Sequence, residues 1–181
     1  MFDRTTAFAA LAALACCLGL TGLQADDKGG ADKTLTDAEF VRKAAQTNIA
    51  EVKLGKLAAE RASNPKVKQF AQLMVEDHSK AQRELTQIAE QKQLTVSTEL
   101  ENKHQMVADK LGRLSGDEFD REYAKTMAKG HKEAVELYEA QSRHGKDAEL
   151  RAFAAKTLPT VQKHLEMAQN LANQLKVGSE R

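Results

Sequence analysis

Four residues whose side chains commonly bind metal ions lie on stretches of the sequence that otherwise resemble the apolar faces of helices. They are Glu51, His78, His131 and His164. Apolar or small side chains flank each of them at steps of three and four residues, the spacing of one face of an α-helix. A carboxylate and three imidazoles buried together are costly unless something satisfies them, and a divalent cation supplies charge and coordination in one step. The pattern therefore predicts a metal site formed by all four residues.

The donor atoms restrict the metal. Imidazole nitrogen suits zinc, copper(II) and iron(II), whereas calcium and magnesium prefer oxygen. One ion of zinc, copper or iron per chain is the expected cofactor, and no other cofactor is expected. A ferritin-type di-iron centre needs a glutamate three residues before a histidine on two helices. Here those positions hold Val75, Ala128 and Val161, so a ferroxidase centre is not expected.

Three further polar residues are expected to surround the ligands. Asn48 lies one helical turn before the candidate glutamate and can hydrogen-bond its carboxylate. Tyr123 lies on the same stripe as the histidine of the third helix, and Asp77 is rotated about 100° from the neighbouring histidine, so it can contribute only at the flank. The alternative to a metal is a buried network in which the cluster satisfies itself through hydrogen bonds and ordered water. No residue is expected to be catalytic.

Four long helices are expected to carry these residues. A capping-box pattern at Thr36 begins the first helix, which is expected to cover 35–62. An Asn-Pro pair at 64–65 begins the second, acidic residues after Gly116 begin the third, and Asp147 can cap the fourth. No segment alternates like a strand. The sequence therefore predicts an all-α fold, a four-helix bundle.

A long connector, from about residue 94 to residue 115, joins the second and third helices. It is long for a bundle loop and has helical character of its own over 98–114. A short helix with extended ends can span the second helix, which is about 40 Å long. Such a crossover makes the second and third long helices parallel, as in ferritin-like bundles, and up-down-up-down is the alternative topology. In either topology the four candidate ligands lie about 19–28 Å from the nearest turn, near the middle of the bundle.

The composition limits the class of protein. The chain has 181 residues, of which 41% are hydrophobic, and only two prolines, so it can bury a core and is not a disordered chain. Its 27 basic and 26 acidic residues give no basic excess, and nucleic acid is not an expected partner. Both cysteines, Cys16 and Cys17, precede the predicted bundle, which therefore has no thiol for redox chemistry.

The beginning of the sequence predicts export. Residues 5–23 carry no charge and are rich in Ala and Leu behind Arg4, which is typical of a secretory signal peptide. Cleavage is expected after Ala25, and the alternative is an uncleaved anchor, because the uncharged run is just long enough to cross a bilayer. The mature chain is expected to contain no transmembrane span. The predicted organisation is a signal peptide over 1–25, a flexible linker over 26–34, the bundle domain over 35–176 and a disordered tail over 177–181.

Several of these elements resemble a large bacterial family of exported proteins. The most specific are a Met-Val-x-Asp-His motif at 74–78 and a Phe-Asp-x-x-Tyr motif at 119–123, and the likeness extends over about 35–175. The family is catalogued as domain of unknown function four-one-four-two, is often labelled outer-membrane or periplasmic, and is regarded as ferritin-like. The resemblance implies a ferritin-like bundle in the bacterial envelope, with the four candidate ligands in the family pattern. It implies no reaction.

Together these features predict an exported helical bundle that binds a transition metal, in envelope stress protection or metal buffering. The expected partner is the metal ion, and an envelope protein or a second copy of the chain is a further candidate. The alternative is a non-catalytic structural or interaction module of the envelope whose Glu/His cluster is a buried hydrogen-bond network. An enzyme ranks third, since it needs an open coordination position that solvent can reach. The expected location is the periplasm or the outer membrane surface.

Overall fold

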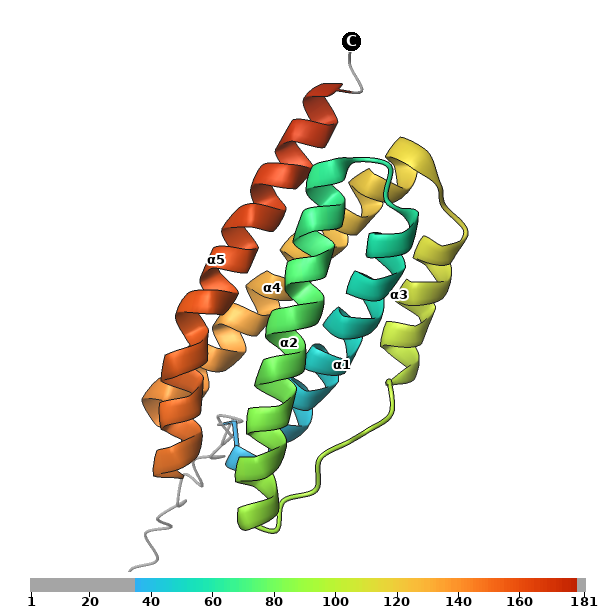
Figure 1. Cartoon of the computed structure of the whole chain (residues 1–181). Coiled ribbons are helices and arrows are strands. Elements are labelled where there is room, and N and C mark those ends of the chain that lie inside the picture. Colours follow the sequence, from blue (N-terminus) through green and yellow to red (C-terminus); the bar gives the residue numbers. More distant parts are fainter. Residues whose placement is uncertain (1–34, 179–181) are drawn as a thin grey trace, which may run out of the picture. The chain divides into compact units, whose positions relative to one another are not determined.

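The computed structural model describes residues 35–178, which form five helices and no strand. The predicted signal peptide and the linker up to residue 34 lie outside the described residues, as do residues 179–181. The helices are α1 (Asp37–Arg61), α2 (Pro65–Gln91), α3 (Asn102–Gly112), α4 (Gly116–His144) and α5 (Ala148–Gly178), as Figure 1 shows. Within the described part of the chain, none of these helices has a stretch long and apolar enough to cross a membrane.

The predicted helix starts are formed by local hydrogen bonds. Thr36 and Glu39 satisfy each other's backbone amides in a capping box, and the side chain of Asn64 accepts a bond from the amide of Lys66. The carboxylate of Asp147 accepts bonds from two amides of the first turn of α5. These caps fix where the three helices begin, and therefore how far along the bundle axis each of their residues lies.

The two ends of the bundle show that α2 and α4 run parallel. At one end, the amides of Ser63 and Asn64, between α1 and α2, donate to the buried carboxylate of Asp120 near the start of α4, at 2.7 to 3.2 Å. At the other end, Lys92, just after α2, pairs with Asp147 in the turn between α4 and α5. Both helices therefore begin at the first end and finish at the second (Figure 1). This is the predicted ferritin-like crossover, and the up-down-up-down alternative is excluded.

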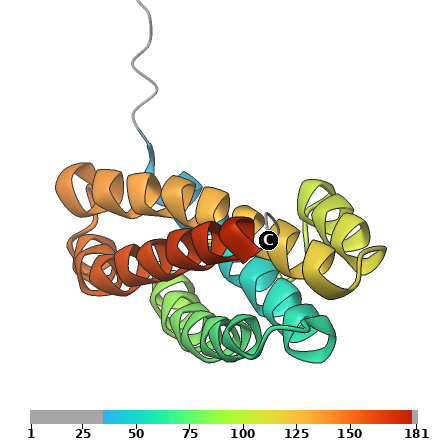
Figure 2. The same cartoon turned by 90° about the horizontal axis from the view of Figure 1, so that it is seen from above.

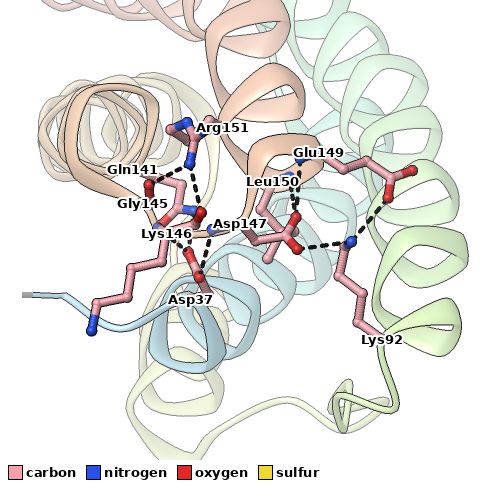
Figure 3. A network of polar contacts seen from close by, with 9 residues as sticks. All are labelled: Asp37, Lys92, Gln141, Gly145, Lys146, Asp147, Glu149, Leu150 and Arg151. Atoms are coloured by element: carbon pink, nitrogen blue, oxygen red, sulfur yellow. Dashed lines mark hydrogen bonds and ion pairs between the residues drawn. The ribbon is translucent and has the colours of Figure 1, made fainter.

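A polar network holds the second end together (Figure 3). The carboxylate of Asp37, at the start of α1, accepts hydrogen bonds from the side chain of Gln141 and from the amides of Lys146 and Asp147. Gly145 is required beside Gln141, because a Cβ there would lie 2.7 Å from the backbone carbonyl oxygen of Gln141. The turn between α4 and α5 is thereby tied to the first residue of α1.

The connector passes along the outside of the bundle, and α3 lies beside α1 and the start of α4 (Figures 1 and 2). The side chain of Gln46 donates to the carbonyl of Glu99 and accepts from the amide of Glu101. These bonds hold the residues before α3 in an extended conformation, so the helix begins at Asn102 and not at residue 98 as the sequence predicted. Arg61 donates to the carbonyl of Gly112 at the other end of α3.

The helices pack as two hairpins, α1 with α2 and α4 with α5. The close approach within the first hairpin depends on Gly55, since a Cβ there would lie 2.8 Å from Val75 Cγ2 and 2.9 Å from the carbonyl oxygen of Ala71. Between the hairpins the apolar core has two parts. One contains Phe70, Phe119 and Tyr123, and the other contains Phe40, Tyr138 and Phe153. Five buried polar side chains each fall between the residues of the two parts along their own helix, and so define a polar level of the bundle: Asn48, Glu51, His78, His131 and His164.

Candidate metal centre

Three histidines from three helices meet at this polar level. They are His78 on α2, His131 on α4 and His164 on α5, and each is at most 4% exposed. Their ring centroids lie 5.4 to 5.5 Å apart. One ring nitrogen of each lies within 4.8 Å of one ring nitrogen of each of the others, and His78 Nε2 is 3.4 Å from His131 Nε2. Side chains more than 30 residues apart in sequence are thus placed around a common centre.

The other nitrogen of each ring faces an oxygen acceptor. His78 Nδ1 lies 3.0 Å from Asn48 Oδ1, His131 Nδ1 lies 2.9 Å from the carbonyl oxygen of Met127, and His164 Nε2 lies 2.9 Å from Asp77 Oδ2. Each of these outer nitrogens therefore carries a proton and donates it. The inner nitrogen of a neutral ring then carries a lone pair, directed away from its hydrogen-bonded partner.

The orientation of Asn48 is fixed by its other contacts. Its amide nitrogen donates to Gln82 Oε1 at 3.3 Å, and its side chain also hydrogen-bonds the hydroxyl group of Tyr138. With the amide hydrogens used there, the carbonyl oxygen is the atom that faces His78. Asn48 is 1% exposed, so this network positions the imidazole of His78 from within the core.

Burial keeps the rings of His78 and His164 neutral. It lowers the pKa of His78 well below its usual value, and the nearby rings of His131 and His164 lower it further. Burial also lowers the pKa of His164 to about 4, with a further decrease from His131, although the hydrogen bond and charge of Asp77 act in the opposite direction. At neutral pH both of these rings therefore present a lone pair, not a second N–H, to the common centre.

Lone pairs that converge on one point favour a cation there. Two acceptor nitrogens 3.4 Å apart repel each other, and the Nδ1 atom of His164 is buried with no hydrogen-bond partner among the described residues. Two imidazole nitrogens bound at about 2.0–2.1 Å in a tetrahedral arrangement are separated by about 3.3 Å. The separation of His78 and His131 thus fits a shared metal ion, and three nitrogen ligands leave one coordination position for another donor.

Glu51 lies beside the histidines but not at their common centre. Its Oε1 atom is 3.7 Å from Nδ1 of His131, the outer nitrogen of that ring. The carboxylate also lies against the backbone of α4, since a Cβ on Gly130 would be 3.4 Å from Oε1. Burial raises the pKa of Glu51, while the adjacent His131 lowers it. In this arrangement Glu51 supplies a buried acidic group behind His131, whereas the sequence predicted a ligand.

The three residues that were predicted to lie around the ligands make different contacts. Asp77 and Asn48 each contact a histidine, and Asn48 bonds His78 where the sequence predicted a bond to Glu51. Tyr123 is fully buried, and burial together with the charge of Glu51 raises its pKa well above the usual value. Among the described residues, neither its hydroxyl group nor Glu51 Oε2 has a hydrogen-bond partner.

Sequence reasoning missed three contributions to the site. The carbonyl of Met127 orients His131, but every residue has a carbonyl, so no sequence signal marks it. Gln82 and Tyr138 hold Asn48. A signal for Gln82 exists, because it lies one helical turn after the histidine of the Met-Val-x-Asp-His motif at 74–78.

Two solved structures have the same helical fold. One is described as "CopM in the Cu(II)-bound form", with 17% sequence identity and a TM-score of 0.65, covering 77% of this chain and 97% of that chain. The other is a crystal structure of a DUF305 fragment from Deinococcus radiodurans, with 14% identity and a TM-score of 0.67, covering 76% of this chain and 95% of that chain. At these identities the likeness shows the fold alone.

A search of the curated proteins finds no match for this sequence. The family model described as "Domain of unknown function (DUF4142)" matches residues 23–171, which is most of the chain and includes all five helices up to the last turns of α5. This is the family whose motifs the sequence resembles at 74–78 and 119–123. The chain is therefore a member of the DUF4142 family.

Proposed function

We propose that the protein binds one transition-metal ion per chain between His78, His131 and His164, and that it buffers this metal or protects against it in the bacterial envelope. The observation that carries the proposal is the direction of the three rings. Each outer nitrogen is held by an oxygen acceptor, so that the three remaining lone pairs converge. A hydrophobic core gains nothing from this arrangement unless a cation or a proton occupies the centre.

Copper is the first metal to test. Three imidazoles suit copper and zinc and are acceptable to iron(II). The fold relative described in its Cu(II)-bound form supports beginning with copper, although the likeness itself concerns only the fold. Zinc and iron are the other outcomes of the same titration.

The buried acidic group of Glu51 supports the same proposal. Three neutral imidazoles leave the charge of a bound dication uncompensated in a region of low dielectric constant. A carboxylate 3.7 Å from the outer nitrogen of His131 can compensate part of that charge without ligating the ion. Glu51 therefore has the role of a charge-balancing group in the proposal, and the three histidines are the ligands.

Metal analysis tests the proposal. The protein, purified without a histidine tag, is titrated separately with copper, zinc and iron(II), and the bound metal is measured by elemental analysis after desalting. We expect about one ion per chain in the wild type and a loss of binding in His78→Ala and His131→Ala. His144→Ala, which removes an exposed histidine at the end of α4, is the matched control and should bind normally. Wild-type protein that binds none of the three metals would refute the proposal.

One contact favours a second candidate function. The 3.4 Å separation of His78 and His131 also suits a single N–H···N hydrogen bond if one inner nitrogen is protonated. The cluster would then fix how the helices pack in a non-catalytic envelope module. This hypothesis predicts that the protein binds no metal. It also predicts that the fold tolerates replacement of all three histidines by apolar residues of similar volume. Metal binding by the wild type would exclude it.

Export is part of the proposal and has its own test. It rests on the signal-peptide pattern over 1–25, which predicts cleavage after Ala25. The full-length chain is expressed in a Gram-negative host, the periplasmic fraction is separated, and the amino terminus of the recovered protein is sequenced. We expect a periplasmic protein that begins at Asp26. A full-length chain retained in the cytoplasm would contradict export.

A further inference from the structure

Asp77 differs from the other groups that hold the histidine rings, because solvent reaches it. Its side chain is 31% exposed, whereas the side chain of His164, to which it is bonded, is 2% exposed. The corresponding acceptors for His78 and His131 are Asn48 and the backbone of Met127, and both residues are buried at 1% exposure. Asp77 is thus the acceptor through which the cluster meets solvent, at the contact between α2 and α5, which we call the α2–α5 seam.

A second surface next to the cluster, over α1 and α2, is positively charged and therefore repels a cation. A surface groove of 410 Å³ lies over α1 and α2, and Asn48 and Gln82 are among its lining residues. Its lining also includes Lys53 and Lys56, both exposed. These ammonium groups repel a metal ion, and Asn48 is held by its bonds to Gln82, Tyr138 and His78. A cation is therefore disfavoured on this side.

We propose that metal ions reach the three-histidine site through the α2–α5 seam, where the Asp77 carboxylate attracts the ion before His164 receives it. This rests on the metal site proposed above. Two features of Asp77 serve this role together. Its negative charge is at the surface, and its bond to His164 Nε2 keeps Nδ1 of that ring directed toward the cluster. A cation attracted to Asp77 is therefore one imidazole away from the centre of the site.

Lys163 carries the opposite charge to Asp77 at the α2–α5 seam. It is exposed on α5 at the position immediately before His164. If ions enter here, removing the Lys163 charge should accelerate binding, whereas removing the Asp77 charge should slow it. If the cation enters elsewhere, its association rate at moderate salt should be the same in both variants as in the wild type.

Stopped-flow measurements of copper(II) and zinc binding to the full mature chain test the route. Asp77→Asn keeps an oxygen acceptor for His164 and removes the charge. We expect association about five- to tenfold slower at low salt, a difference that shrinks at high salt, and a dissociation rate within about twofold of the wild type. Lys163→Gln should associate faster. Glu76→Gln, which removes the same charge from an exposed position on another face of α2, is the control and should resemble the wild type.

The outcomes separate the two proposals. Wild-type protein that binds no metal overturns the three-histidine site and the route with it. If the wild type binds metal but Asp77→Asn and Lys163→Gln associate at the wild-type rate, the site stands and the route is wrong. If Asp77→Asn changes only the dissociation rate, Asp77 positions His164 and does not attract the ion, which also overturns the route.

Discussion

Acid should destabilise the metal-free protein, because the folded state keeps His164 neutral. Burial lowers the pKa of this histidine from 6.5 to about 4, and the charge of His131 adds to the decrease. In the unfolded chain the ring titrates near its ordinary value of about 6.5. Between these two pH values the unfolded state binds more protons than the folded state. Stability is therefore lost as the pH falls through this window and is not lost further below it.

The size of the effect follows from the two pKa values. Between pH 7.5 and pH 5, His164 alone should reduce the free energy of unfolding by about 2 kcal/mol. For about 140 ordered residues this corresponds to about 7 °C in melting temperature. His78, whose pKa is lowered by burial and by the other two rings, acts in the same direction. Glu51 acts in the opposite direction, because burial raises its pKa and the folded state then takes up its proton first.

Urea unfolding in the presence of a chelator measures this loss. The wild type is compared at pH 7.5 and pH 5 with His164→Gln, whose side-chain amide can still donate to Asp77 but does not titrate. The acid-induced loss should be smaller by about 2 kcal/mol in the variant. His144→Gln, at an exposed position, should show the wild-type loss. Equal losses in the wild type and His164→Gln would refute the reasoning.

Three further substitutions test the packing and the positioning groups. Gly55→Val should lower the free energy of unfolding in urea by about 1–3 kcal/mol through overpacking, because a Cβ there would lie 2.8 Å from a side-chain carbon of α2. The control is Gly112→Ala, where a Cβ would meet nothing within 4 Å, and this variant should not be destabilised. Asp120→Ala leaves two amides at the start of α2 without their acceptor and should cost about 1–3 kcal/mol. Asp120→Asn should recover part of that loss, and a melting temperature unchanged in Asp120→Ala would show that solvent replaces the carboxylate. Asn48→Ala should weaken metal binding about 10–100-fold, since His78 loses the acceptor that orients its ring; competition against a chelator of known affinity measures this, and wild-type affinity would contradict a positioning role.

The fold was predictable because its determinants are local. The capping box at Thr36, the Asn-Pro pair at 64–65 and the periodic apolar residues all act within one or two helical turns. The crossover followed from the length of the connector alone. The start of α3 could not be predicted in this way, since the residues before it are held extended by Gln46, which is more than 50 positions away in the sequence.

The candidate site was predictable in height but not in orientation. Helical spacing places Glu51 and the three histidines on inward faces at a similar level, and the structure brings the histidines together there. Spacing does not specify the rotation of a ring or which of its nitrogens faces inward. Those depend on acceptors from other helices, such as Asn48 for His78, and on a backbone carbonyl for His131. For the same reason the sequence could not show that Glu51 lies behind His131.

The distribution of the histidines between the two hairpins has a consequence for the lifetime of the protein. His78 belongs to the α1–α2 hairpin, while His131 and His164 belong to the α4–α5 hairpin. A shared ion would join the hairpins at mid-height as a removable cross-link, and would suppress their separation more than the fraying of helix ends. Proteases that cut only the opened molecule would then degrade the metal-free form first. Under the proposed function, the abundance of the protein would follow the supply of the metal it holds.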